Sequence, residues 1–110
     1  MAEMVFSIAD NFSRFPGPRH RWQGPHSGES LRTRLSRLLR ENRGRIRVIL
    51  DGTTGIGSSF LDEAFGGLIR DEGFSKDEVS SRFCFVSEVD PSYLVTINES
   101  IARAEVRAEQ

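Results

Sequence analysis

Hydrophobic residues fall along the chain in two patterns, short continuous runs and longer stretches with helical spacing. The short runs occupy residues 4–8, 46–50 and 83–87 and are rich in β-branched and aromatic side chains, so each predicts a β-strand. The run at 46–50 is nearly all apolar, which predicts a central strand covered on both faces.

Three helices are predicted by apolar residues that recur every three or four positions. The first spans residues 27–42 with Ser27 as its N-cap, and its apolar face is made of Leu31, Leu35, Leu38 and Leu39. The second follows residue 58 and has a wider face, made of Phe60, Leu61, Ala64, Phe65, Leu68 and Ile69. The third begins at Pro91, with Asp90 as its N-cap.

A Gly/Ser/Thr turn separates the central strand from the second helix. Its glycines allow unusual backbone angles, and Ser58 or Ser59 is the expected N-cap, with Asp62 completing a pair like a capping box. The carboxyl end of a strand is the favoured place for a site in an open α/β sheet. The candidate binding residues of this turn are Asp51, Thr53, Thr54, Gly55 and Gly57.

A glycine pair, Gly66–Gly67, interrupts the second helix. Each glycine costs about 1 kcal/mol of helix stability relative to alanine, so the pair needs a reason. Close packing of the backbone against the sheet or another helix is the favoured explanation, and a hinge is the alternative.

The order of elements predicts an α/β fold, with a small mixed sheet of about four strands and three main helices. The fourth strand would be Arg19–His20–Arg21–Trp22, paired as a hairpin with the first. We expect one domain over residues 1–110, with an irregular basic segment at 10–26 and a polar tail at 105–110.

Charge is distributed unevenly between the two halves. Residues 1–50 hold ten Arg and four acids, a net charge of +6, whereas residues 51–110 hold five basic and twelve acidic residues, a net of −7. The favoured interpretation is that the halves complement each other within the fold or between subunits. The alternative is nucleic-acid binding by the basic half, with a cationic-aromatic cluster at Arg14, Arg19, Arg21 and Trp22.

Few residues are suited to catalysis or to holding a metal. Cys84 is the single cysteine and lies in an apolar run, so it is expected to be a buried strand thiol in a reducing compartment. His20 and His26 are the only histidines, no Cys/His set has zinc spacing, and no P-loop is present. We therefore expect no enzyme, no cofactor and no metal, and the absence of a signal peptide or apolar span predicts a cytoplasmic protein with no membrane contact.

The run DGTTGIGSSFLDEAFGGLIR, with its preceding strand, resembles the bacterial STAS-like domain of unknown function, over roughly residues 8–104. That family is named for its similarity to the STAS fold of anti-anti-sigma factors. The resemblance implies a small regulatory protein that binds an anti-sigma, histidine-kinase-like ATPase. It also implies a phosphorylated switch serine, at the position of Ser58 with Ser59 after it. Gly57 and Phe60 stand where those switch proteins usually carry Asp and Gly.

The leading hypothesis is a non-catalytic interaction domain for signalling and regulation, which is a phosphoprotein if the switch is present. It would bind its partner through the turn 53–59 and the exposed side of the second helix, with Asp62, Glu63 and Arg70 at the rim. The alternatives are a nucleotide- or anion-sensing domain that uses the same turn, and nucleic-acid binding through the Arg-rich half. A homo-oligomer is a further alternative.

Overall fold

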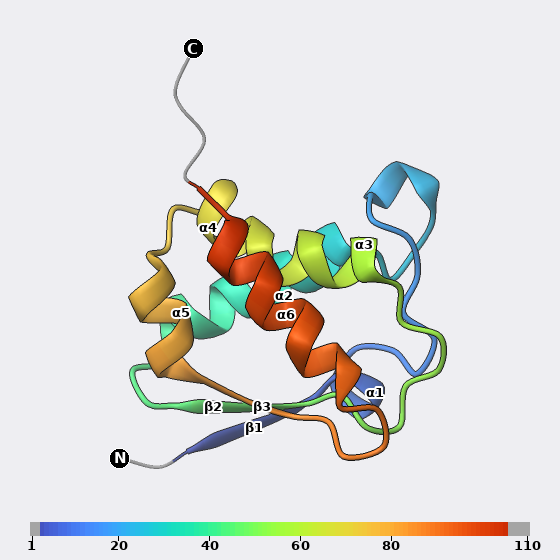
Figure 1. The fold of residues 1–110 in the computed structure, drawn as a ribbon, viewed down its shortest axis with the longest axis horizontal. Coiled ribbons are helices and arrows are strands. Elements are labelled where there is room, and N and C mark those ends of the chain that lie inside the picture. Colours follow the sequence, from blue (N-terminus) through green and yellow to red (C-terminus); the bar gives the residue numbers. More distant parts are fainter. Residues whose placement is uncertain (1–2, 106–110) are drawn as a thin grey trace.

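The computed structural model describes residues 3–105, so residues 106–110 of the predicted polar tail lie outside the described part. Three strands form one parallel sheet in the order β1-β2-β3, with β1 at Met4–Ser7, β2 at Ile46–Ile49 and β3 at Phe83–Val86. The prediction of a mixed sheet was wrong, because each strand returns through a crossover that contains a helix (Figure 1).

A fourth strand at residues 19–22 is not formed. Arg21–Gln23 is a short 3-10 helix, η1, and the described residues contain three strands. The backbone N–H groups of Gly28 and Glu29 donate to the carbonyl oxygens of Pro18 and Arg19, at 2.9 and 3.0 Å, so this segment is tied to the start of the next helix rather than to β1. A second short helix, α1 at Ile8–Asn11, follows β1 directly.

The predicted cap is confirmed for the first long helix but not for the last, whose N-cap residue is Pro91 instead of Asp90. Helix α2 runs over Gly28–Glu41, and Ser27 accepts a hydrogen bond from the backbone N–H of Ser30. Helix α6 spans Ser92–Arg103, and Asp90, two residues before it, accepts from the N–H of Ser92 at 3.1 Å. Between them lies α5 at Lys76–Arg82, which begins with a capping box of Ser75 and Glu78.

The central helix is continuous but changes its pitch. It consists of α3 at Ser58–Leu61, a π-helical turn (η2) at Asp62–Gly66, and α4 at Gly67–Arg70. All six residues of its predicted apolar face are at most 2% exposed. A Cβ on Gly66 would lie 3.3 Å from the carbonyl oxygen of Ser100 in α6, and one on Gly67 would lie 2.7 Å from Cδ of Arg32 in α2. The glycine pair therefore allows close packing, as predicted.

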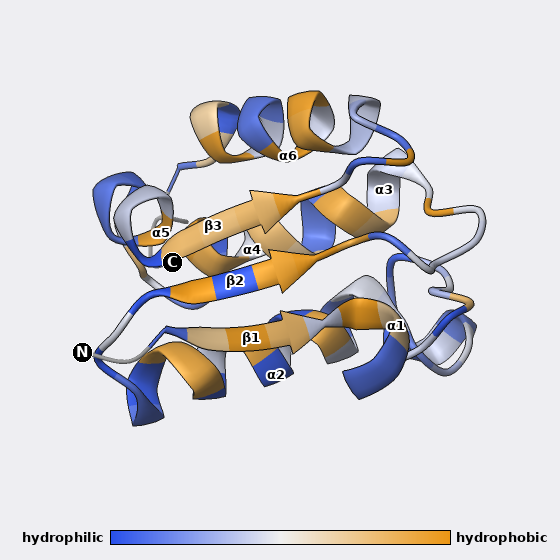
Figure 2. Cartoon of the chain, turned by 90° about the horizontal axis from the view of Figure 1, so that it is seen from below, coloured by the Kyte–Doolittle hydropathy of each residue, from blue (hydrophilic) through white to orange (hydrophobic). Residues whose placement is uncertain are grey.

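The long helices cover one face of the sheet, and the other face is open in this chain (Figure 2). Val5, Arg47 and Cys84 are aligned across the three strands on the open face, and Val5 is 55% exposed. The prediction that β2 is covered on both faces was wrong, since Arg47 interrupts its apolar run and points outward. Cys84 is partly rather than fully buried. Within residues 3–105, no helix is long and apolar enough to cross a bilayer.

Candidate functional site

The turn after β2 lies at the carboxyl edge of the sheet. Gly52 and Gly55 have φ angles of 92° and 69°, which glycine adopts without strain. The hydroxyl of Thr53 donates to the carbonyl oxygen of Leu50 at 2.7 Å, and the N–H of Thr54 donates to the carbonyl oxygen of Arg14 at 2.9 Å. The turn is therefore tied both to its own strand and to the basic segment.

Asp51 fastens this turn to the loop that follows β3. Its carboxylate accepts hydrogen bonds from the backbone N–H groups of Val89 and Glu88, at 2.8 and 2.9 Å. These bonds, with that of Val89 the stronger influence, hold the pKa of Asp51 below its usual range. A cleft of about 320 Å3 lies beside it, lined by Asp51, Thr53, Thr54, Gly55, Ser87, Val89, Asp90 and Tyr93 among others. Four of the candidate residues thus meet in one cleft, and Gly57 lies outside it.

The two serines do not cap the central helix. Gly57 is the N-cap residue, with extended backbone angles and no side-chain bond, so Ser58 is already the first helical residue. The prediction of a serine cap was wrong, and so was the pairing with Asp62, whose carboxylate is bound by arginines instead. Within residues 3–105, neither serine hydroxyl has a hydrogen-bond partner, and both residues are exposed.

A second hollow, also of about 320 Å3, opens beside these serines. The serine pair forms one wall, the basic segment contributes Arg19, and α6 contributes the opposite wall. Its lining residues are Arg19, Ser58, Ser59, Asp62, Thr96, Glu99, Ser100 and Arg103. This feature combines two guanidinium groups with two hydroxyls that have no structural bond.

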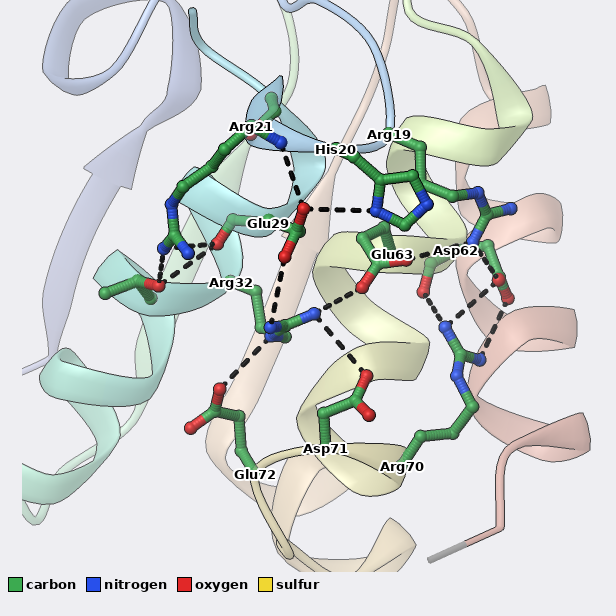
Figure 3. A network of polar contacts seen from close by, with 12 residues as sticks. Arg19, His20, Arg21, Glu29, Arg32, Asp62, Glu63, Arg70, Asp71 and Glu72 are labelled. Carbon is green, nitrogen blue, oxygen red and sulfur yellow. Dashed lines mark hydrogen bonds and ion pairs between the residues drawn. The ribbon is translucent and has the colours of Figure 1, made fainter. Parts of the chain in front are cut away.

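Asp62, one of the residues that line this hollow, is the centre of an ion-pair cluster; its contacts with Arg19 and Arg70 are drawn in Figure 3. Its carboxylate lies 3.0 Å from Arg19, 3.1 Å from Arg70 and 3.6 Å from Arg103. Burial on its own raises the pKa of Asp62, but hydrogen bonds from Arg19 and the charge of Arg70 outweigh it, so the pKa lies below its ordinary value. Burial acts to lower the pKa of Arg19, but its hydrogen bonds and ion pairs with Asp62 and Glu63 outweigh burial and raise that pKa.

The neighbouring Glu63 is buried, with 5% of its surface exposed. It accepts a hydrogen bond from Arg19 at 3.1 Å and forms a close ion pair with Arg32 of α2. Arg32 also reaches Glu72 at 3.1 Å, so one guanidinium joins α2 to both the middle and the end of the central helix. The space comes partly from Gly28, where a Cβ would lie 2.8 Å from that of Glu63.

These ion pairs join arginines of the first half to acids of the second, which confirms that the two halves complement each other within the fold. Asp62, Glu63 and Arg70 were predicted at the rim of a partner surface, but the structure places them in this internal network. Sequence reasoning did not single out Arg32 or Arg103. Arg32 directly follows Leu31, which is fully buried, so the sequence did indicate that Arg32 lies beside the buried face of its helix.

The cationic-aromatic cluster does not form one site. Arg14 pairs weakly with Asp10 at 3.8 Å, Arg19 faces Asp62, and Arg21 donates to α2. Trp22 is 81% exposed and its ring stacks on that of His20, with centroids 5.9 Å apart. The imidazole of His20 lies 3.1 Å from the carboxylate of Glu29, whose pKa is lowered chiefly by the backbone N–H of Arg21.

Residues 27–93 match the family model of the STAS-like domain of unknown function (DUF4325). The match includes the turn, both serines and the central helix, and it is shorter than the resemblance expected over residues 8–104, so Arg19 and Arg103 lie outside it. Comparisons with curated proteins and with solved structures give no significant match. Because the family model covers more than half of the chain, this protein belongs to the family of STAS-like domains of unknown function.

Proposed function

We propose that this chain is a non-catalytic regulatory domain that binds a protein partner at the end of the molecule carrying the turn 53–59. The observation that carries the proposal is the state of Ser58 and Ser59, which are exposed and have no structural hydrogen bond. A polar side chain at the start of a helix usually supplies a cap. Freed from that role, these hydroxyls are accessible to a kinase and to a partner.

Phosphorylation at this pair would act as the switch. A phosphoserine adds about −1.5 to −2 charges and three acceptor oxygens to a surface that now carries neutral hydroxyls. Such a change repels an acidic or apolar partner surface. The resemblance to anti-anti-sigma factors supplies the class of partner, a histidine-kinase-like ATPase, and the cytoplasmic location expected from the sequence belongs to this same proposal.

The segment beside the serines has the composition of a protein interface. Phe15 and Trp22 are 72% and 81% exposed, and the same segment supplies Arg19 to the hollow next to the serines. Large exposed aromatic side chains are common at the energetic centre of interfaces. The aromatic residues and the switch serines would then face the same partner.

The alternatives have weaker support. For anion or nucleotide sensing through the turn 53–59, the carboxylates of Asp51 and Asp90 line the adjoining cleft and would repel an anion. For nucleic-acid binding, Arg19 and Arg32 would contribute charge, but both are paired with carboxylates. For catalysis, His20 would be a candidate base, but its ring is held against Glu29 and Trp22.

The test is a quantitative pull-down from the native host with Ser58→Asp, Ser58→Ala and the same pair of changes at residue 59. Ser80→Asp is the matched control, because Ser80 is an exposed serine on α5. We expect recovery of an ATPase partner to fall at least tenfold with Asp at one of the two switch positions and to persist with Ala and with Ser80→Asp. Equal recovery by all variants would show that the serine pair is not a switch.

A further inference from the structure

One arginine of the hollow beside the serines is held only by a long contact. Arg103 extends from α6, its side chain is 66% exposed, and its nearest carboxylate oxygen, on Asp62, is 3.6 Å away. Asp62 already receives Arg70 and Arg19 at shorter distances. Arg103 is therefore the third and most weakly held cation on a single carboxylate.

The serines line the same hollow as two of these cations. Asp62 follows Ser59 by three residues and Ser58 by four, so all three side chains project from neighbouring positions on one side of the helix. Arg19 and Arg103 line the hollow together with both serines. Ser100 lies on the opposite wall, and its hydroxyl is the one buried side-chain polar atom without a hydrogen-bond partner among residues 3–105.

We propose that a phosphate on Ser58 or Ser59 is bound within the same chain by Arg103 and Arg19, which turn from Asp62 toward the phosphate. The proposal rests on the proposed function, since it takes this serine pair as the modified site. A kinase would transfer the terminal phosphoryl group of ATP to the seryl oxygen. The seryl O–H bond and the β–γ P–O bond break, an O–P ester bond forms, and ADP and a proton leave.

The exchange of partners follows from charge and geometry. A phosphate carries more charge than a carboxylate and offers three oxygens, and guanidinium groups bind such oxygens in pairs. Asp62 would keep Arg70, which donates to its carboxylate from Nη1 and Nη2 and to its backbone carbonyl oxygen from Nη2. Asp62 and the exposed Glu99 oppose the phosphate, so both arginines are needed to hold it in the hollow.

Movement of Arg19 gives the modification a route to the partner surface. Arg19 now bridges Asp62 and Glu63 and lies in the same segment as the stacked His20 and Trp22. Movement of its guanidinium toward the phosphate would shift the chain at residue 19, next to the stacked rings. The phosphate would then alter the aromatic surface as well as the charge at the turn.

The experiment installs phosphoserine during synthesis at position 58, 59 or 80 and measures the pKa of each phosphate by 31P NMR. A phosphate without a cationic partner has a second pKa of about 6. We expect a value lower by about half a pH unit at position 58 or 59, a roughly threefold change in the ionisation constant, and no lowering at position 80. The position with the lower value identifies the serine that the arginines can reach.

Variants at Arg103 separate a specific contact from general surface charge. Arg103→Gln should return the phosphate pKa to that of position 80, and Arg103→Lys should restore part of the lowering. Because Arg103 is mostly exposed, these variants should fold. Phosphates at 58 and 59 that titrate like the one at 80, or that do not respond to Arg103→Gln, would overturn the proposal. Because this titration uses no partner, it tests the phosphate contact within the chain independently of the pull-down, which tests the switch.

Discussion

Two successive turns of the central helix have opposite environments. The first turn carries Ser58 and Ser59, which are exposed and have no hydrogen-bond partners among the described residues. The next carries Asp62 and Glu63, which are held by Arg70 of the same helix and by arginines from three other segments. Three residues along one helix thus separate a surface that is open for binding from a network that holds the fold together.

The contrast shows that residue type alone does not indicate which role a polar side chain has. Charged residues are usually found at the surface, whereas serines at a helix start are usually caps. Here the carboxylate of Glu63 is buried and paired, and the serines are left free because Gly57 takes the cap position. Four measurements test this difference, and they follow in order of expected effect.

Removal of the carboxylate of Glu63 should have the largest effect. Glu63→Ala leaves Arg32, whose side chain is 11% exposed, without its closest partner. Breaking a buried ion pair on one side costs up to about 3–5 kcal/mol, and Arg32 keeps Glu72 at 3.1 Å, so urea unfolding should show a loss of about 2–4 kcal/mol. Glu41→Ala, at an exposed position on α2, is the control and should change stability by less than about 0.5 kcal/mol. Equal effects would mean that the network contributes little to the fold.

Filling the space at Gly28 should have the next largest effect. Gly28→Ala places a Cβ 2.8 Å from the carbonyl oxygen of Phe60, and that backbone cannot move without disturbing the central helix. We expect a loss of about 1–3 kcal/mol, as for other overpacked positions. At Gly57, nothing lies within 4 Å of an added Cβ, so Gly57→Ala should cost less. A smaller loss at residue 28 than at 57 would contradict the close packing of α2 on α3.

Acidification should weaken the network and the Asp51 contact together. The pKa values of Asp62 and Asp51 are lowered in the folded state, so below pH 4 or so the unfolded chain binds more protons at these residues. The stabilisation is present above that pH and is lost as pH falls through the folded pKa values. Urea midpoints measured from pH 7 to pH 3 should decrease less steeply in Asp51→Asn, and an unchanged pH slope would exclude Asp51 as a contributor.

The serines should show the smallest effect. Ser58→Ala and Ser59→Ala remove hydroxyls that have no structural bond, so each should change stability by less than about 0.5 kcal/mol. Ser27→Ala is the matched comparison, since Ser27 accepts a hydrogen bond from the N–H of Ser30, and it should cost about 1 kcal/mol. Thermal unfolding of the three variants is sufficient. A loss of stability at residue 58 or 59 as large as that at residue 27 would indicate that this serine caps the helix.

Much of the local structure could be predicted from spacing. The apolar face of the central helix and the cap at Ser27 depend on residues near one another in the chain, and the glycine pair at residues 66 and 67 by itself indicated a close approach of another segment. The strands were also located within a residue or so of their observed ends. Their pairing was predicted less well, because the Arg19–Trp22 segment has strand-like side chains but is tied to α2.

The sequence by itself determined where the helices and strands form, how charge divides between the two halves, and to which family the chain is similar. Only the tertiary structure decided which charges meet, since Arg19 and Asp62 are 43 residues apart and Arg32 and Glu63 are 31 apart. It also decided that the serines stay free and that one sheet face stays open. Helix and strand patterns reflect neighbours along the chain, whereas ion pairs and burial depend on segments that folding brings together.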